Sequence, residues 1–208
     1  MRRFLCSLAI AGVLIASRLD GALVSITDNG PTAFGADSVT WDTGAGLEWL
    51  DLTFSVNMSY DSVSSQLGSG GTFDGWRIAT GSEVSTLFGN AGITSVIGGG
   101  FISQATTGPT EALIDLVGNT LAAPEQQADG QFDDGGGALI GRARVFVAGP
   151  GDASSRIDTN WFDRTSPNEF TGTWLVRDAP PIPEPTTILL LGVGTLGLGC
   201  RLRRRTSH

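Results

Sequence analysis

The chain has 208 residues and a net charge of −8, from 21 acidic and 13 basic side chains, and all of the basic residues are arginine. Its two cysteines, Cys6 and Cys200, lie in apolar segments near the two ends, and its one histidine is the last residue, His208. The interior therefore has no side chains for a catalytic cysteine or histidine, a zinc site of Cys and His, a disulfide framework or a lysine Schiff base.

Residues 1–22 have the order of a secretory signal peptide. Arg2 and Arg3 precede an apolar run over residues 4–16, which is too short for the about 20 residues of a membrane-spanning helix. Ala16, Ser17 and Ala22 are the candidate cleavage positions, but none is a clean site, since a cut after Ala22 has the charged Asp20 where a small residue is preferred. The alternative is a buried N-terminal helix, but the charge order favours export.

Residues 23–179 are predicted to form one acidic, glycine-rich α+β domain. Between residues 23 and 180 there are 19 Asp and Glu against six Arg, which gives a net charge of −13. A surface of this charge repels nucleic acid and anionic membranes and suits a secreted protein.

Short alternating patterns predict strands early and late in this domain, with helices between them. Strands are expected over 23–26, 38–41, 46–52, 138–148 and 171–177, helices from Ser59, from Thr80 and after Pro109, and a loop over 122–137. The second helix is the best marked, because Thr80 and Glu83 have capping-box spacing. The helices have no regular alternation with strands, so the pattern indicates α+β rather than a parallel α/β sheet.

The C-terminal end has three consecutive parts. A proline-rich spacer covers 180–185, an apolar stretch covers 186–200, and a basic tail covers 201–208. As a helix the apolar stretch is about 22 Å long at 1.5 Å per residue, short of a hydrocarbon core of about 30 Å. We therefore expect a temporary membrane anchor with its arginines on the cytoplasmic side.

These parts resemble the PEP-CTERM sorting signal recognised by exosortases. The resemblance rests on Pro183, Glu184 and Pro185, the short glycine-rich apolar stretch, and the terminal cluster of Arg201, Arg203, Arg204 and Arg205. It implies secretion, transient anchoring in the inner membrane, removal of the tail by an exosortase, and placement at the cell surface or outside the cell. The alternative is a tail-anchored protein that keeps its helix.

The central region resembles the C-type-lectin-like domains of Lcl-type bacterial adhesins. Residues 40–90 carry the resemblance through Gly46-Leu-Glu-Trp-Leu-Asp51 and Gly71-Thr-Phe-Asp-Gly-Trp-Arg-Ile-Ala-Thr80, and Trp174-Leu-Val-Arg177 is similar to the family's closing strand. The family's paired cysteines and the calcium and sugar motifs of animal lectins are absent. Calcium-dependent sugar binding is therefore not implied.

One group of residues, around Trp161, is a candidate for ligand binding. Trp161, in a segment predicted as a polar loop with Asp163 and Arg164, is the best candidate for an exposed stacking residue. By contrast, we expect Trp49, Trp76 and Trp41 in the core, with Arg77 paired to a nearby acid.

Asp129, Asp133 and Asp134 lie in a glycine-rich segment that could wrap oxygen ligands around calcium. The segment fails the EF-hand pattern, and the alternative is an ordinary solvated loop. We therefore expect no cofactor, with calcium as the one open alternative.

The sequence thus predicts an exported, non-enzymatic surface or matrix component that binds exopolysaccharide or another envelope glycan. Its expected partners are the exosortase and secretion machinery and, before processing, the membrane. One alternative is a carboxylate-based glycan hydrolase, because such an enzyme needs only two suitably placed carboxyl groups and the domain has 19 acidic side chains. Another is a structural matrix protein without a specific ligand.

Overall fold

The computed structural model describes residues 21–181 except 29, 31–32, 122 and 136. The chain divides into two compact units, Met1–Arg177 and Asp178–His208, and the second is described only up to Pro181. Most of the predicted signal peptide, the Pro-Glu-Pro sequence, the apolar stretch 186–200 and the basic tail lie outside the described residues. Within the described ranges, none of the helices has the length and apolar character needed to cross a membrane.

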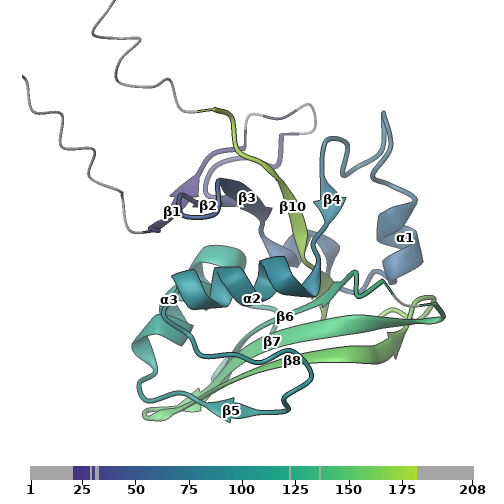
Figure 1. Cartoon of the computed structure of the whole chain (residues 1–208). Helices are drawn as coiled ribbons and strands as arrows, with labels where there is room; N and C mark the ends of the chain where they lie inside the picture. Colours follow the sequence, from purple (N-terminus) through teal and green to yellow (C-terminus); the bar gives the residue numbers. More distant parts are fainter. Residues whose placement is uncertain (1–20, 29, 31–32, 122, 136, 182–208) are drawn as a thin grey trace, which may run out of the picture. The chain divides into compact units, whose positions relative to one another are not determined.

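Two five-stranded sheets, both within the first unit apart from the last strand residue, organise the described chain (Figure 1). The first sheet has the order β1 (Leu23–Ile26), β2 (Val39–Asp42), β3 (Leu47–Leu50), β10 (Leu175–Asp178) and β4 (Arg77–Ile78). The second has the order β5 (Ile102–Ser103), β8 (Asp152–Asp163), β7 (Leu139–Gly149), β6 (Gln126–Phe132) and β9 (Gly172–Thr173). Strands β5, β8, β7 and β6 pair antiparallel, whereas β6 and β9 pair parallel.

Four helical segments complete the fold: η1 (Leu52–Ser55), α1 (Tyr60–Ser64), α2 (Gly81–Asn90) and α3 (Gly108–Val117). This mixture of helices and sheets confirms the α+β class. Helix α2 begins as predicted, since the Thr80 side chain accepts a hydrogen bond from the Glu83 N–H and the Glu83 side chain accepts one from the Thr80 N–H. The apolar spacing of Tyr60, Val63 and Leu67 predicts a longer α1 than the structure has, since the helix ends at Ser64.

The larger core cluster lies between the two sheets and contains the buried faces of α2 and α3. Val84, Leu87 and Phe88 of α2 pack there with Leu113 of α3, against the inward side chains of β6, β7 and β8. The opposite face of the first sheet is covered by a smaller cluster that includes Trp76. The middle strands β2, β3 and β10 are therefore covered on both faces, whereas the edge strands β1 and β4 are partly exposed.

Trp174 joins the two sheets at the point where the chain passes from β9 to β10. Its N–H donates to the Gln131 carbonyl in the second sheet, and its carbonyl accepts from the Ala79 N–H beside the first. The indole N–H donates to the Ala143 carbonyl at 3.1 Å, and the ring meets Trp49 edge-on at 6.1 Å between centroids. With 1 % of its surface exposed, Trp174 is the central side chain of the core.

The predicted loop over 122–137 is wrong for its middle part, which is strand β6. Its polar side chains look solvated in the sequence, yet Gln127, Asp129 and Gln131 are all buried. Asp129 is bound by Arg142 of β7 and the Gln127 amide donates to the Phe170 carbonyl, whereas the Gln131 amide has no hydrogen-bond partner among the described residues. Strand β8 was not predicted either, so Trp161 lies on a strand and not in a loop.

Candidate functional site

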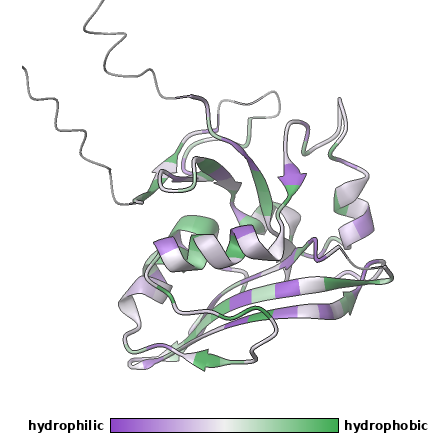
Figure 2. Cartoon of the chain, in the orientation of Figure 1, coloured by the Kyte–Doolittle hydropathy of each residue, from purple (hydrophilic) through white to green (hydrophobic). Residues whose placement is uncertain are grey.

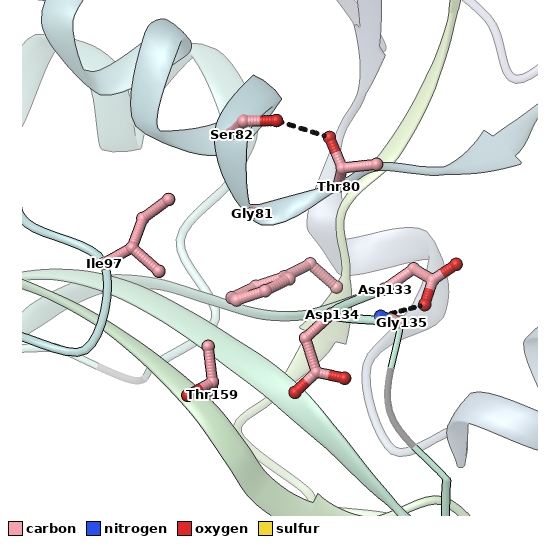
Figure 3. Close-up of a pocket in the computed structure, with 9 residues that line it drawn as sticks. Thr80, Gly81, Ser82, Ile97, Asp133, Asp134, Gly135 and Thr159 are labelled. Atoms are coloured by element: carbon pink, nitrogen blue, oxygen red, sulfur yellow. Dashed lines mark hydrogen bonds between the residues drawn. The ribbon is translucent and has the colours of Figure 1, made fainter.

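A pocket of about 400 Å³ opens between the start of α2 and the end of β6. Figure 3 shows Thr80 and Ser82 on the helix side, with their hydroxyl groups pointing toward each other, and Asp134 and Thr159 on the opposite side. Gly81, Ile97, Phe132, Asp133 and Gly135 complete its lining. The lining thus combines hydroxyl and carboxylate groups with the apolar side chains of Ile97 and Phe132.

Local hydrogen bonds hold the two pocket carboxylates in place. Asp133 accepts a hydrogen bond from the Gly135 N–H at 2.9 Å, and Asp134 accepts one from the Asn160 N–H at 2.7 Å. The Asp133 N–H also donates a hydrogen bond to the carbonyl of Ala79, and this bond links the end of β6 to the segment just before α2. These bonds fix the rim of the pocket before any ligand binds.

The three aspartates considered as calcium ligands do not come together. Asp129 is completely buried and accepts hydrogen bonds on both oxygens from Arg142, whereas Asp133 and Asp134 line the pocket. Burial raises the pKa of the Asp129 carboxyl, and the hydrogen bonds from Arg142 oppose that shift. Across the part of the chain that is described, no three His, Cys, Asp or Glu side chains are grouped so that they could hold a metal ion.

The residues grouped around Trp161 in the sequence also separate. Arg164 pairs with Asp61 at 3.0 Å and lies over the Tyr60 ring, 4.6 Å from its centroid. Asp163 accepts hydrogen bonds from the N–H and hydroxyl of Thr165, and these bonds lower the pKa of its carboxyl. Trp161 is exposed, as predicted, with 44 % of its surface accessible, but neither neighbour contacts the ring in a shared site.

Trp161 instead belongs to an alternating series of aromatic rings and guanidinium groups, which we call the aromatic–arginine row. Its members in order are Phe146, Arg144, Phe101, Arg156 and Trp161. The successive distances from guanidinium carbon to ring centroid are 5.6, 4.8, 4.8 and 4.3 Å. Each arginine thus lies between two rings, in the range of cation–π attraction.

The row crosses the face of the second sheet that points away from the main core. On β7, Ala143 and Val145 point into the core, while Arg144 and Phe146 are on the other face and are partly exposed. Figure 2 shows this alternation as hydrophilic bands between hydrophobic ones along β7 and β8. Phe101 and Trp161 expose 53 % and 44 % of their surface, so the row offers two fixed aromatic surfaces to solvent.

A bulge in β8 places Trp161 in the row. Ile140 pairs with Phe162 and Arg142 pairs with Asp158, so Thr159, Asn160 and Trp161 stand opposite the single residue Gly141. Asn160 has a left-handed backbone with φ of 52°, a conformation that asparagine tolerates better than most residues. The bulge sends Thr159 to the pocket and Trp161 to the row.

Arg144 differs from the other arginines of the described domain. Arg77, Arg142, Arg156, Arg164 and Arg177 each have a carboxylate within ion-pair distance. Among the described residues Arg144 has none at that distance, and its hydrogen bond is to the neutral Gln127 side chain, at 3.4 Å. Burial, with the charges of Arg142 and Arg156, lowers the pKa of Arg144, although an arginine stays protonated at neutral pH.

Sequence reasoning found Trp161 but missed Arg144, Arg156 and Phe101. These residues come from three segments that pair across the sheet, so their spacing along the chain carries no signal. One signal was available: Arg142, Arg144 and Phe146 alternate with Ala143 and Val145, the pattern of a strand with one buried and one exposed face.

Comparison with known proteins identifies the C-terminal segment. Residues 181–205 match the PEP-CTERM protein-sorting motif. The match supports an exported protein that passes through a membrane-anchored stage and is sorted by an exosortase. No curated protein and no solved structure matches the chain.

Proposed function

We propose that this protein, once sorted, is a non-enzymatic component of the cell surface or extracellular matrix that binds polysaccharide through the aromatic–arginine row. The observation that carries the proposal is the pair of half-exposed rings, Phe101 and Trp161, held on either side of Arg156. Apolar faces of sugar rings stack on aromatic rings, and rings already fixed by a guanidinium lose little freedom on binding. What distinguishes these two rings from other exposed aromatic residues is that they share one guanidinium, that of Arg156, and so belong to one surface.

The C-type-lectin-like resemblance of residues 40–90 is part of this proposal. It is supported by the sequence pattern from Gly46 to Asp51 and from Gly71 to Thr80. The location outside the cell is also proposed, and the sorting motif supports it. A lectin-like protein outside the cell would meet the polysaccharide of the matrix, so we take this polysaccharide as its ligand.

Glycan hydrolysis is the second candidate, and the pocket is the observation that favours it. Asp133 and Asp134 both line the pocket, and a glycosidase needs two carboxyl groups about 5–10 Å apart. However, both carboxylates already accept backbone hydrogen bonds. Binding is therefore the better supported function.

Affinity electrophoresis of the full-length chain, in mild detergent and in gels that contain the host's exopolysaccharide, tests the proposal. We expect the wild-type chain to be retarded and Trp161→Ala to migrate freely. Phe54→Ala is the matched control, because Phe54 is a comparably exposed aromatic residue (40 %) that packs on Phe34, outside the row. Equal migration of wild type and Trp161→Ala would refute the proposal, and release of reducing ends from the polymer would replace it with hydrolysis.

The intact mass of the protein recovered from outside the native host cells tests its sorting. A mass that lacks the N-terminal segment and ends near Pro183–Pro185 supports export and cleavage. A full-length C-terminus retained in membranes would contradict the proposed location.

A further inference from the structure

The ligand class of the aromatic–arginine row follows from its charge, and this inference rests on the function proposed above. The described domain is strongly acidic, with 19 Asp and Glu against six Arg between residues 23 and 180. In such a chain an arginine finds a carboxylate easily, as five of the six do. Arg144, in the middle of the row, is the exception within the described ranges.

The carboxylate opposite Arg144 in the sheet is already bound by another arginine. Asp129 is the direct cross-strand partner of Arg144, but both of its oxygens accept hydrogen bonds from Arg142. On the other side the cross-strand partner is Arg156, whose own charge is matched by Asp158 at 2.6 Å. Arg144 therefore keeps donor capacity that none of the described side chains satisfies with a negative charge.

Two rings fix the position of this guanidinium. Its carbon lies 4.8 Å from the Phe101 centroid and 5.6 Å from the Phe146 centroid. A planar guanidinium binds a carboxylate through two parallel hydrogen bonds, and fixing the plane in advance lowers the entropic cost of that contact. Phe101, which is half exposed, offers a sugar face next to the same group.

We infer that the row recognises a carboxylated polysaccharide, with the sugar rings on Phe101 and Trp161 and a uronate carboxylate on Arg144. A neutral glycan would leave the charge of Arg144 unmatched. An anion without a sugar ring would leave the two aromatic surfaces uncovered. A polymer of uronic acids satisfies both parts of the row together. The domain as a whole carries −13, but the row itself is locally positive, because Arg156 is matched by Asp158 and Arg144 has no carboxylate within ion-pair distance among the described residues.

Binding of the full-length chain, in mild detergent, to polygalacturonate and to the same polymer after reduction of its carboxyl groups tests the inference. We expect the wild-type chain to bind the acidic polymer at least tenfold more tightly, a difference of about 1.4 kcal/mol. Arg144→Gln should lose this preference. Arg144→Lys should recover only part of it, because an ammonium keeps the charge but not the two-point geometry.

Arg164→Gln is the matched control for charge. It removes one positive charge from the same acidic domain, from an arginine that is also stacked on a ring but lies outside the row. We expect it to bind like the wild type. Equal binding to both polymers, or equal loss in Arg144→Gln and Arg164→Gln, would overturn the inference. If the inference is overturned but Trp161→Ala still abolishes binding, the proposal that the row binds polysaccharide stands. If the wild-type chain binds neither polymer, both the inference and that proposal fail.

Discussion

Arg144 and Arg156 are direct cross-strand neighbours on β7 and β8, and both guanidinium carbons lie 4.8 Å from the centroid of the Phe101 ring. Like charges in this position normally destabilise a sheet. Phe101 offsets the repulsion, because its ring attracts both cations. The ring is therefore a structural element of the surface as well as a binding element.

Replacing Phe101 by alanine tests this stabilising role. Two cation–π contacts at about 0.5–1 kcal/mol each predict a loss of about 1–2 kcal/mol in the free energy of unfolding at low salt. Salt screens the exposed repulsion, so the loss should shrink as ionic strength rises. Urea unfolding at low and at high salt measures both effects, and a loss that does not change with salt would contradict the explanation.

Trp174→Ala is expected to cost about 3–5 kcal/mol in the free energy of unfolding, because it leaves a large cavity where the two sheets meet. It also leaves the Ala143 carbonyl without the indole donor. Chemical denaturation followed by circular dichroism measures the change. Trp161→Ala is the comparison, because Trp161 is 44 % exposed and its removal should cost far less.

Gly141→Ala should destabilise the domain by about 1–3 kcal/mol. A Cβ at Gly141 would clash with the buried ring of Phe132, whereas a Cβ at Gly149, in the same strand β7, meets no heavy atom within 4 Å. Gly149→Ala is therefore the control and should be close to neutral. If the clash is the cause, adding Phe132→Leu to Gly141→Ala should cost less than the sum of the single changes.

Glu83 links the start of α2 to the stability of the domain in acid. Its side chain receives hydrogen bonds from Arg77 and from the Thr80 N–H, and these contacts lower the pKa of Glu83 to about 2. Because the pKa is lower in the folded state than its ordinary value of 4.5, ionised Glu83 stabilises the fold at pH values above 4.5. This stabilisation is lost as the pH falls from 4.5 toward 2. The difference in unfolding free energy between wild type and Glu83→Gln should be largest near neutral pH and vanish near pH 2. A difference that is constant across this range would show that the charge of Glu83 is not responsible.

Glu184→Ala, or deletion of residues 201–205, should leave the uncleaved protein in the membrane fraction, since both changes remove part of the sorting motif. Ser207→Ala, beyond the motif, should be processed normally. Immunoblots of membrane and external fractions from the native host distinguish these outcomes. Normal release of both motif variants would show that the motif does not direct processing.

The sequence predicted best those features that depend on neighbouring residues. The capping box of Thr80 and Glu83 is local, and so is Gly118, a residue type that predicts the end of a helix. The structure confirms both, with Gly118 at φ of 93° directly after α3. Trp76 and Trp49 are core residues and Arg77 pairs with Glu83, as expected; Trp41 is only partly buried.

Features that depend on pairing between distant strands were missed. Strand β6 looked like a loop because its burial depends on Arg142, 13 residues beyond Asp129. The apolar residues Ala112, Leu113, Leu116 and Val117 predict one buried face for α3, but in the structure Ala112 is exposed and Ile114 is buried. The partner of Trp161 was misassigned for the same reason, since Arg156 reaches it only through the bulge in β8.

The passage of one segment through both sheets has a consequence for the order of events during export. Residues 172–178 supply β9 to the second sheet and β10 to the first, and the sorting motif begins only three residues later, at residue 181. A chain translocated from its N-terminus cannot close either sheet until this segment has emerged. The last segment needed to complete the two sheets and the start of the sorting motif therefore leave the membrane within a few residues of each other.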